Sequence, residues 1–175
     1  MKNYLIPKSS RFRALLICGI WLAGLEGGEV LGAGERNANE PIGTVRSYVE
    51  AFNRGDVEAM AASFAVPGFI LDGMPPHVWQ GPNAPRDWFR DAQAMAKKQK
   101  LTEEHIVLTG DPLHQQVTGK SAYVVVPVSF SYKMNGKLVN QSGAYFTIAL
   151  TQVSGVWHIA SWAWTKGVTK GTPAF

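Results

Sequence analysis

The spacing of apolar residues changes along the chain, from a helical period in the first half to alternation in the second. Apolar side chains recur at helical spacing, three or four positions apart, at Val45, Tyr48, Val49 and Phe52. This period predicts a helix that Thr44 caps and that ends at Asn53. A second helix is expected over 57–64 and a third over 84–98, the latter with Trp88 on its apolar stripe.

Turn signals separate these helices and lead to a single acid. Gly55 suits the left-handed position just after a helix, and Asp56 can cap the helix that follows. Pro67-Gly68 is expected to end the second helix, and residues 69–72 then form a short strand. Asp72 closes this otherwise apolar strand. An acid there needs water, a partner or a raised pKa, and the last of these makes Asp72 a candidate proton carrier.

From Leu101 onward the apolar residues alternate with polar ones, as they do in antiparallel strands. After a short strand at 77–80, the expected strands cover 102–109 (or, in a longer bent form, 102–116), 122–133, 138–153 and 156–166. The hairpin signal Asn135-Gly136 separates two of them. Helices first and long antiparallel strands second predict an α+β fold.

The same alternation assigns side chains to the two faces of the sheet. One apolar face holds Ala144, Phe146, Ile148 and Leu150. In the last strand, Trp162 shares a face with Ala160 and Trp164, whereas Trp157 and Ile159 are expected on the other face. The outer face is expected to hold Tyr123, Val125, Ser129, Ser131, Gln141, Tyr145 and Thr147.

Residues 1–33 have the layout of a secretory signal peptide. Four basic residues precede an apolar run of 12 residues, 14–25, and small residues follow at 32–34. The run is too short to span a bilayer, which takes about 20 residues. Cleavage near Ala33 or Gly34 therefore predicts an exported protein, periplasmic or secreted, without a stable membrane span. An uncleaved membrane-surface anchor is the alternative.

Cleavage would change the composition of the mature chain. It removes four basic and two acidic residues from totals of 17 and 13, so the net charge falls from +4 to +2. The basic character is thus no argument for a nucleic-acid partner. The single cysteine, Cys18, is also lost, so no disulfide or thiol nucleophile is expected. The linker then covers 34–40, one domain covers 41–167, and 168–175 form a loose tail.

The order of these motifs resembles the nuclear-transport-factor-2-like superfamily, including its SnoaL-like and ketosteroid-isomerase-like branches. The resemblance rests on the turn Asn53-Arg54-Gly55-Asp56, the helix end Phe64-Ala65 and the final Gly-x-Trp-x-Ile at 155–159. It implies a cystatin-like cone, in which three N-terminal helices pack in a curved, mostly antiparallel sheet with a cavity at its open end. This fold hosts many enzymes and binding modules, so it does not by itself identify a reaction.

The resemblance also implies roles for three positions. Tyr48 matches the oxyanion-stabilising tyrosine of ketosteroid isomerases, and Asp72 matches their general base. The position of the third group, a protonated acid, is occupied by Ala144. Losing one oxyanion donor typically lowers the rate on the order of 100-fold or more. Each residue has a plainer alternative: Tyr48 as a packed side chain, and Asp72 as a cap for the amides of the following turn.

Other residues are predicted to surround the pair. His77 lies five residues after Asp72 and could act with it as a base or orienter; the alternative is an exposed loop histidine. Trp79, Trp88, Phe146 and Trp162 are candidate contacts for a small apolar ligand, or else fill a core or dimer face. The four histidines lack metal-ligand spacing, and the chain lacks phosphate-cradling and dinucleotide-binding motifs, so neither a metal nor a cofactor is expected.

Two functions therefore remain open. One is an exported enzyme that carries out cofactor-free acid–base chemistry on a small carbonyl compound, with Asp72 as base and Tyr48 as donor. The other is a non-catalytic module that binds a small ligand, or a homodimer that pairs through the outer face of its sheet.

Overall fold

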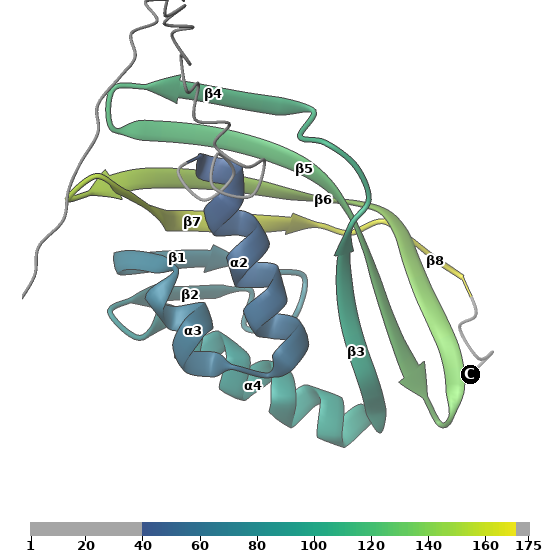
Figure 1. Cartoon of the computed structure of the whole chain (residues 1–175). Coiled ribbons are helices and arrows are strands. Elements are labelled where there is room, and N and C mark those ends of the chain that lie inside the picture. Colours follow the sequence, from purple (N-terminus) through teal and green to yellow (C-terminus); the bar gives the residue numbers. More distant parts are fainter. Residues whose placement is uncertain (1–39, 171–175) are drawn as a thin grey trace, which may run out of the picture. The chain divides into compact units, whose positions relative to one another are not determined.

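The computed structural model describes residues 40–170, and the predicted signal peptide, its cleavage site and Cys18 lie outside this range. Figure 1 shows helices on one side of a curved sheet. The elements, in order, are α2 (Pro41–Arg54), α3 (Val57–Ala62), β1 (Phe64–Leu71), β2 (Val78–Gly81), α4 (Ala84–Gln99), β3 (Leu101–Leu108), β4 (His114–Thr118), β5 (Ser121–Met134), β6 (Lys137–Val153), β7 (Val156–Thr165) and β8 (Val168–Lys170).

The sheet has eight strands, and its main path runs β2-β1-β7-β6-β5-β3. β1 pairs in parallel with β7, and the other pairs are antiparallel. The long strand β5 pairs with β4 near its start and with β3 near its end. The predicted α+β class and mostly antiparallel sheet are thus confirmed. Within residues 40–170 no helix is long and apolar enough to cross a membrane.

Helix α2 starts earlier than its apolar spacing predicted. Its N-cap is Glu40, and Pro41 occupies the first helical turn, where a missing N–H costs nothing. The prediction of Thr44 as the cap is wrong: its Oγ1 donates 3.0 Å to the backbone oxygen of Trp157 and so ties α2 to β7. The turn that follows is confirmed, since Gly55 is left-handed (φ 68°) and Asp56 accepts from the amide of Ala59.

Strand β1 is twice as long as predicted and begins at Phe64, which had been assigned to the preceding helix. Pro67-Gly68 lies inside β1, where the register with β7 shifts between Phe64 and Phe69. Proline is tolerated in such an irregular stretch because no ladder hydrogen bond is lost there. Asp72 therefore follows the strand, in the turn that leads to β2.

Two bulges overturn the predicted faces of the late strands. In β7, Ala149 of β6 pairs with Ser161 but Leu150 pairs with Ile159, so Ala160 is an extra residue. An extra residue inverts the alternation, and Trp162 therefore lies on the buried face together with Trp157 and Ile159.

The second bulge lies in β6. Positive φ at Gly143 accompanies a register shift against β5, and Gln141 is only 7% exposed, not on the outer face as predicted. Its side-chain oxygen accepts 3.0 Å from Nε1 of Trp164. The predicted inner face of Ala144, Phe146, Ile148 and Leu150 is confirmed, because all four are buried.

The shorter of the two alternatives for the strand after Leu101 is confirmed, because β3 covers Leu101–Leu108. The longer bent form is wrong, since His114–Thr118 form the separate strand β4. At the other end, part of the predicted loose tail is ordered, because β8 pairs with β6 between Asn140 and Ser142. Residues 171–175 lie outside the described part.

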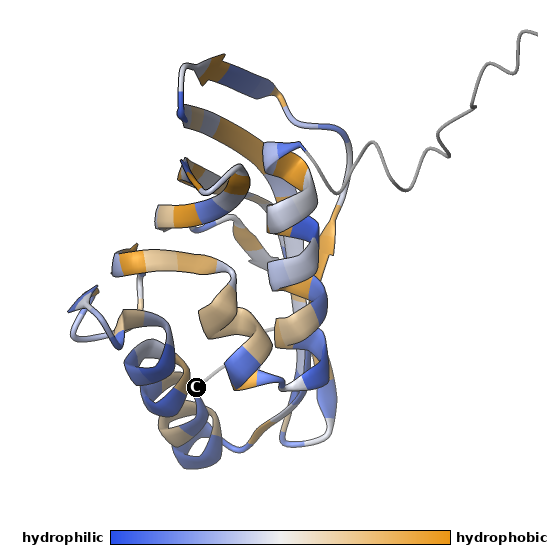
Figure 2. Cartoon of the chain, turned by 60° about the vertical axis from the view of Figure 1, so that its left-hand side comes forward, coloured by the Kyte–Doolittle hydropathy of each residue, from blue (hydrophilic) through white to orange (hydrophobic). Residues whose placement is uncertain are grey.

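The hydrophobic core fills the space between the helices and the sheet. It joins side chains of α2 and α4 to the inner faces of the strands, and its fully buried members include Val45, Met60, Ile70, Val124 and Ile159. Figure 2 shows hydrophilic residues along much of α4, whereas the strands carry long hydrophobic stretches. Helix α4 thus covers the core with one stripe only, which includes Trp88 and Ala96.

The side chain of Asn53 joins the end of α2 to the free edge of β3. Its Nδ2 donates 2.8 Å to the backbone oxygen of Ile106, and its Oδ1 accepts 2.8 Å from the amide of the same residue. Asn53→Ala would leave both groups of the buried Ile106 without a partner. We expect a loss of about 1–3 kcal/mol in the free energy of unfolding by urea.

The matched control for this substitution is Asn140→Ala, because Asn140 is an exposed strand residue without a side-chain hydrogen bond to the described residues. We expect this variant to stay within about 0.5 kcal/mol of the wild type. Equal losses in the two variants would contradict the assigned role of Asn53.

Candidate functional site

Asp72 sits at the end of β1, and protein donors engage both of its carboxylate oxygens. Oδ1 accepts 2.8 Å from the amide of Met74, and Oδ2 accepts 3.1 Å from Nε1 of Trp88 on α4. The first bond is the turn cap that the sequence offered as an alternative. The second directs the half-buried carboxylate toward the core. A carboxylate has about four lone-pair sites, so both oxygens keep the capacity to take a proton.

Trp88 connects Asp72 to a cluster of buried aromatic rings. Trp88 and Trp162 meet edge to face with ring centroids 5.1 Å apart. Trp162 in turn packs against Phe146 at 5.3 Å and near Tyr48 at 6.4 Å. Asp72, which directly follows β1, and Tyr48, which lies on α2, are therefore on the two sides of one aromatic pair. The sequence analysis paired the two residues but did not predict the tryptophan pair that lies between them.

Two polar atoms in this cluster lack hydrogen bonds. Neither the hydroxyl of Tyr48 nor Nε1 of Trp162 has a partner among the described residues, and both side chains are only 2% exposed. The indole lies near enough to lower the pKa of the phenol, yet the two groups do not reach hydrogen-bond geometry. An unpaired buried donor costs about 1–3 kcal/mol. A single acceptor atom placed beside both groups would remove that cost.

The phenol of Tyr48 is held in its protonated form. Burial, above all, raises its pKa far above the ordinary value; the nearby Trp162 indole lowers it, and the negative charge of Asp72 raises it further. A protonated phenol is a hydrogen-bond donor. Tyr48 can thus stabilise negative charge on an oxygen atom but cannot serve as a base.

His77 is close to Asp72 but meets its backbone. Its Nδ1 lies 3.1 Å from the backbone oxygen of Asp72, and its own backbone oxygen accepts from the amide of Asp72. The imidazole is exposed, and its backbone is left-handed (φ 76°). The structure therefore shows no direct contact between the imidazole and the carboxylate. A catalytic role for His77 stays a prediction.

The four predicted ligand contacts are all buried. Trp79 donates through Nε1 to Oδ2 of Asp91 at 2.9 Å, and Phe146 packs edge to face on Trp164 at 4.8 Å. Trp88 and Trp162 form the pair described above. Two open cavities in the described part of the chain, presented next, are lined neither by these side chains nor by Asp72 or Tyr48.

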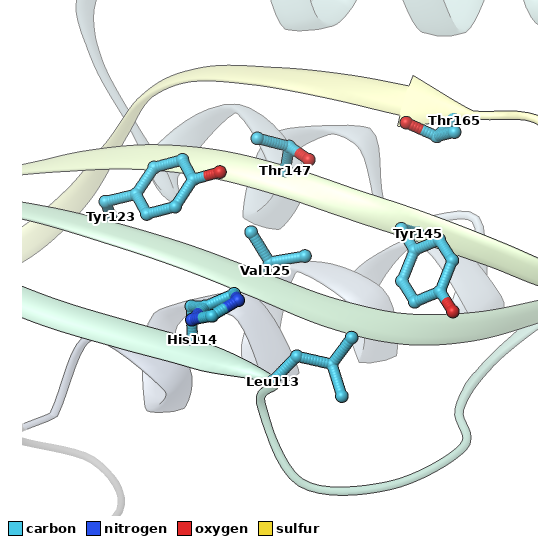
Figure 3. A pocket seen from close by; sticks show the side chains of 7 residues that line it. All are labelled: Leu113, His114, Tyr123, Val125, Tyr145, Thr147 and Thr165. Atoms are coloured by element: carbon cyan, nitrogen blue, oxygen red, sulfur yellow. The ribbon is translucent and has the colours of Figure 1, made fainter.

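The first of these cavities lies on the outer face of the sheet and has a volume of about 330 Å³. It is lined by Leu113, His114, Tyr123, Val125, Tyr145, Thr147 and Thr165. Figure 3 shows these side chains in front of the strands, with the helices behind. Four of the predicted outer-face residues, Tyr123, Val125, Tyr145 and Thr147, are thus found there. The surface is apolar and hydroxyl-rich, with one titratable imidazole at His114.

The second cavity, about 250 Å³, opens between the end of α2, helix α4 and strand β3. We call it the Glu104 cavity; it is lined by Phe52, Asn53, Arg54, Gly55, Phe89, Gln93 and Glu104. Sequence reasoning missed Glu104, because Glu103, Glu104 and His105 together suggest a solvated face. No local signal marks the difference between the two neighbouring glutamates.

Burial raises the pKa of the Glu104 carboxyl above its ordinary value. A raised folded-state pKa means that the stability contributed by this group is complete below its unfolded pKa and is lost as the pH rises through its folded pKa. Glu104→Gln carries no charge at any pH. We therefore expect it to match the wild type below about pH 4 and to unfold at higher urea concentration than the wild type at neutral pH.

Glu103→Gln is the neighbouring control for this pH dependence. Its exposed carboxylate pairs with Lys133 at 2.7 Å, and such surface pairs contribute about 0–1 kcal/mol. This variant should gain no stability at neutral pH. A Glu104→Gln effect that is the same at low and neutral pH would contradict the assigned cost of the buried charge.

Comparison with known proteins supports one fold. The sequence profile of the SnoaL-like domain family matches residues 43–164, whereas no curated protein sequence matches the chain. A nuclear transport factor 2 (NTF2-like) superfamily protein from Salmonella enterica serovar Typhimurium superimposes with a TM-score of 0.63 at 13% identity, over 78% of this chain and 94% of that one.

Two further solved structures carry enzyme names. A hexachlorocyclohexane dehydrochlorinase, LinA type 2, gives a TM-score of 0.62 at 8% identity, over 75% of this chain and 86% of that one. A ketosteroid isomerase-like protein from Erwinia carotovora gives a TM-score of 0.57 at 15% identity, over 74% of this chain and 95% of that one. The resemblance in the sequence motifs is thereby confirmed at the level of the fold. In residues 40–170 no three His, Cys, Asp or Glu side chains form a cluster that could hold a metal ion.

Proposed function

Because this chain belongs to the SnoaL-like domain family, we propose that it is an exported enzyme that moves a proton on a small apolar carbonyl compound without a cofactor. One observation carries the proposal. The carboxylate of Asp72 accepts from Trp88, the ring of Trp88 contacts Trp162, and beside Trp162 the buried hydroxyl of Tyr48 has no partner among the described residues. A base and an unused donor at one apolar site suit the formation of an enolate.

In the proposed reaction Asp72 takes a proton from the carbon next to the substrate carbonyl. The electron pair of the broken C–H bond forms a carbon–carbon double bond, and the π pair of the carbonyl moves onto its oxygen, to which the Tyr48 hydroxyl donates a hydrogen bond. Asp72 then returns a proton to the same carbon or, in a β,γ-unsaturated substrate, to the γ-carbon, which shifts the carbon–carbon double bond into conjugation with the carbonyl. The second outcome is an isomerisation. No external acid is needed, because the carboxyl that removes a proton also returns one. The half-buried carboxyl exchanges its proton with solvent in between, so in D₂O it returns deuterium.

The position corresponding to a third catalytic acid is the buried Ala144, which can neither donate nor accept through its side chain. Trp162 Nε1 is an unused donor in the same aromatic cluster. The substrate oxygen would enter beside Tyr48 and Trp162, so the rings of Trp88 and Trp162 must separate when it binds. The proposed substrate is therefore small and mainly apolar.

The two enzyme-named neighbours support this reaction class, since a dehydrochlorinase and a ketosteroid isomerase-like protein share the fold. At 8% and 15% identity the shared property is the fold, and the chemistry assigned to this chain is our proposal. Export rests on the sequence of residues 1–33, and N-terminal sequencing of the mature protein tests it.

Hydrogen exchange at carbon tests the activity without knowledge of the product. Small apolar ketones and aldehydes, including β,γ-unsaturated ketones, are incubated with the protein in D₂O and followed by proton NMR. We expect loss of the proton signal next to the carbonyl to be faster with the wild type than in buffer. Equal rates with and without protein across the panel would overturn the proposal.

The second candidate function is that of a homodimer that serves as a binding module. It is favoured by the outer cavity, whose apolar side chains Leu113 and Val125 are bordered by the hydroxyls of Tyr123 and Tyr145. A surface with few charges and with groups that both donate and accept can pair with its own copy across a two-fold axis. Sedimentation at micromolar concentration tests this second function. We expect the wild type to be a dimer and Val125→Glu to be a monomer. A monomeric wild type would exclude the homodimer.

A further inference from the structure

We propose that the Glu104 cavity binds a small organic ammonium cation that carries an apolar group, with the Glu104 carboxylate as its counter-ion. This site is separate from the proposed proton-transfer residues, because neither Asp72 nor Tyr48 lines the cavity. The inference goes beyond the proposed function and does not depend on it.

The first argument is the missing partner of Glu104. Of the carboxylates in residues 40–170 that are not fully exposed, Asp72, Asp87 and Asp91 each accept hydrogen bonds from named donors. Glu104 is the remaining member of this group, and no donor or cation among the described residues reaches it. A partly buried carboxylate without a partner costs free energy, and a bound cation would remove that cost.

The second argument is the backbone that orients Glu104. Thr102 of β3 pairs with Lys133 but His105 pairs with Ser131, so two glutamates stand opposite Tyr132. Glu103 is left-handed (φ 55°), which costs free energy for a side chain of this kind. The bulge directs Glu103 to Lys133 at the surface and leaves Glu104 in the cavity. Bulges often aim one side chain at a site in this way.

The third argument is the aromatic wall of the cavity. The rings of Phe52 and Phe89 meet edge to face with centroids 6.4 Å apart, and both line the space beside Glu104. The faces of aromatic rings attract cations. Tyr132 stands opposite the two glutamates in the strand register, and burial and the charge of Glu104 both raise the pKa of its phenol. A charged amine with an apolar group matches this combination of a carboxylate and aromatic faces.

Arg54 also lines the cavity and carries a charge of the opposite sign. It is exposed, whereas Glu104 is half-buried, so water can solvate the guanidinium but only in part the carboxylate. No ion pair forms between the two among the described contacts. The group that needs a ligand is therefore Glu104. The volume, about 250 Å³, lies just below the usual range for drug-sized ligands and limits the ligand to a small molecule.

Calorimetric titration of the full chain with three probes of matched shape tests the proposal. The probes are 2-phenylethylammonium, the neutral 2-phenylethanol and the anionic 3-phenylpropionate. We expect the ammonium probe to bind about 10-fold or more tightly than the alcohol, and the anion to bind more weakly than either. An alcohol that binds as tightly as the ammonium probe, or an anion that binds best, would overturn the proposal.

Three variants test whether the ammonium probe binds beside Glu104. Glu104→Gln keeps the shape of the side chain and should lower the affinity for the ammonium probe about 10-fold or more, with the alcohol unchanged. Glu103→Gln, the outward-facing neighbour, should leave both affinities unchanged. Arg54→Gln should leave ammonium binding unchanged or stronger. Equal losses in the two glutamate variants, or a loss in Arg54→Gln, would refute the assignment.

A further variant keeps the test informative if Glu104→Gln changes the fold. Phe89→Leu removes an aromatic face but conserves an apolar side chain, and it should weaken binding of the ammonium probe more than that of the alcohol. Equal weakening of both probes would count against a cation site. None of these outcomes depends on catalysis by Asp72, so failure of the proposed enzyme activity is seen separately in the exchange experiment.

Discussion

Asp72→Asn is expected to lower the rate of proton exchange next to the substrate carbonyl on the order of 100- to 10,000-fold, the usual contribution of a positioned general base. Asparagine has nearly the same shape, and its side-chain oxygen can still accept from the amide of Met74. Its amide cannot take up a proton at neutral pH. The measurement is the exchange rate at carbon, by proton NMR in D₂O, for the substrate that the wild type turns over fastest.

The control must separate lost chemistry from lost stability. The asparagine NH₂ would face the N–H of Trp88, two donors in contact, so some loss of stability is expected as well. Asp87→Asn provides the comparison, because Asp87 is also half-buried and accepts from Arg90 on the outer side of α4. Both variants should remain folded by circular dichroism, and only Asp72→Asn should lose exchange activity. An unchanged exchange rate in folded Asp72→Asn would exclude Asp72 as the base.

Tyr48→Phe is expected to have opposite effects on activity and on stability. Removing one donor to a developing oxyanion typically lowers the rate on the order of 100- to 1,000-fold. The hydroxyl has no partner among the described residues, so the folded protein loses no hydrogen bond with it. Removing a buried, unsatisfied group should leave the free energy of unfolding unchanged or raise it by about 1 kcal/mol. Urea unfolding and the exchange rate are measured on the same preparation.

Tyr145→Phe is the matched control, since Tyr145 lies on the outer face of the sheet and lines the outer cavity. Tyr145→Phe should change neither the exchange rate nor the free energy of unfolding by much. A loss of stability in Tyr48→Phe would mean that the hydroxyl has a partner in solution. Full activity in Tyr48→Phe would remove the phenol from the mechanism and leave Trp162 as the candidate donor in the cluster.

Much of the fold could be predicted because its signals are local. Helical spacing around Tyr48, left-handed Gly55 and the capping Asp56 each depend on a few neighbouring residues. The hairpin at Asn135-Gly136 is equally local, since both residues have positive φ, as a tight two-residue turn requires. Motif order across the whole domain then indicated the SnoaL-like family, whose profile matches residues 43–164, and the fold that the structural comparison confirms.

The candidate site could be predicted only in part. Tyr48 and Asp72 were expected near each other from the resemblance, and they are joined through Trp88 and Trp162. Trp162 was placed on the face opposite Ile159, because strict alternation was assumed through Ala160. Glu104 was missed because its polar neighbours Glu103 and His105 suggest a solvated face. Both errors arise at residues inserted into a strand ladder.

The sequence by itself therefore determined the order of the elements, their turns and the family, because propensity, capping and turn geometry act over a few residues. Only the tertiary structure decided which side chains meet. Bulges at Glu103–Glu104, Gly143 and Ala160 each reverse the facing of the residues that follow, and each is fixed by pairing with a strand distant in sequence. The aromatic cluster and the Glu104 cavity both depend on those pairings.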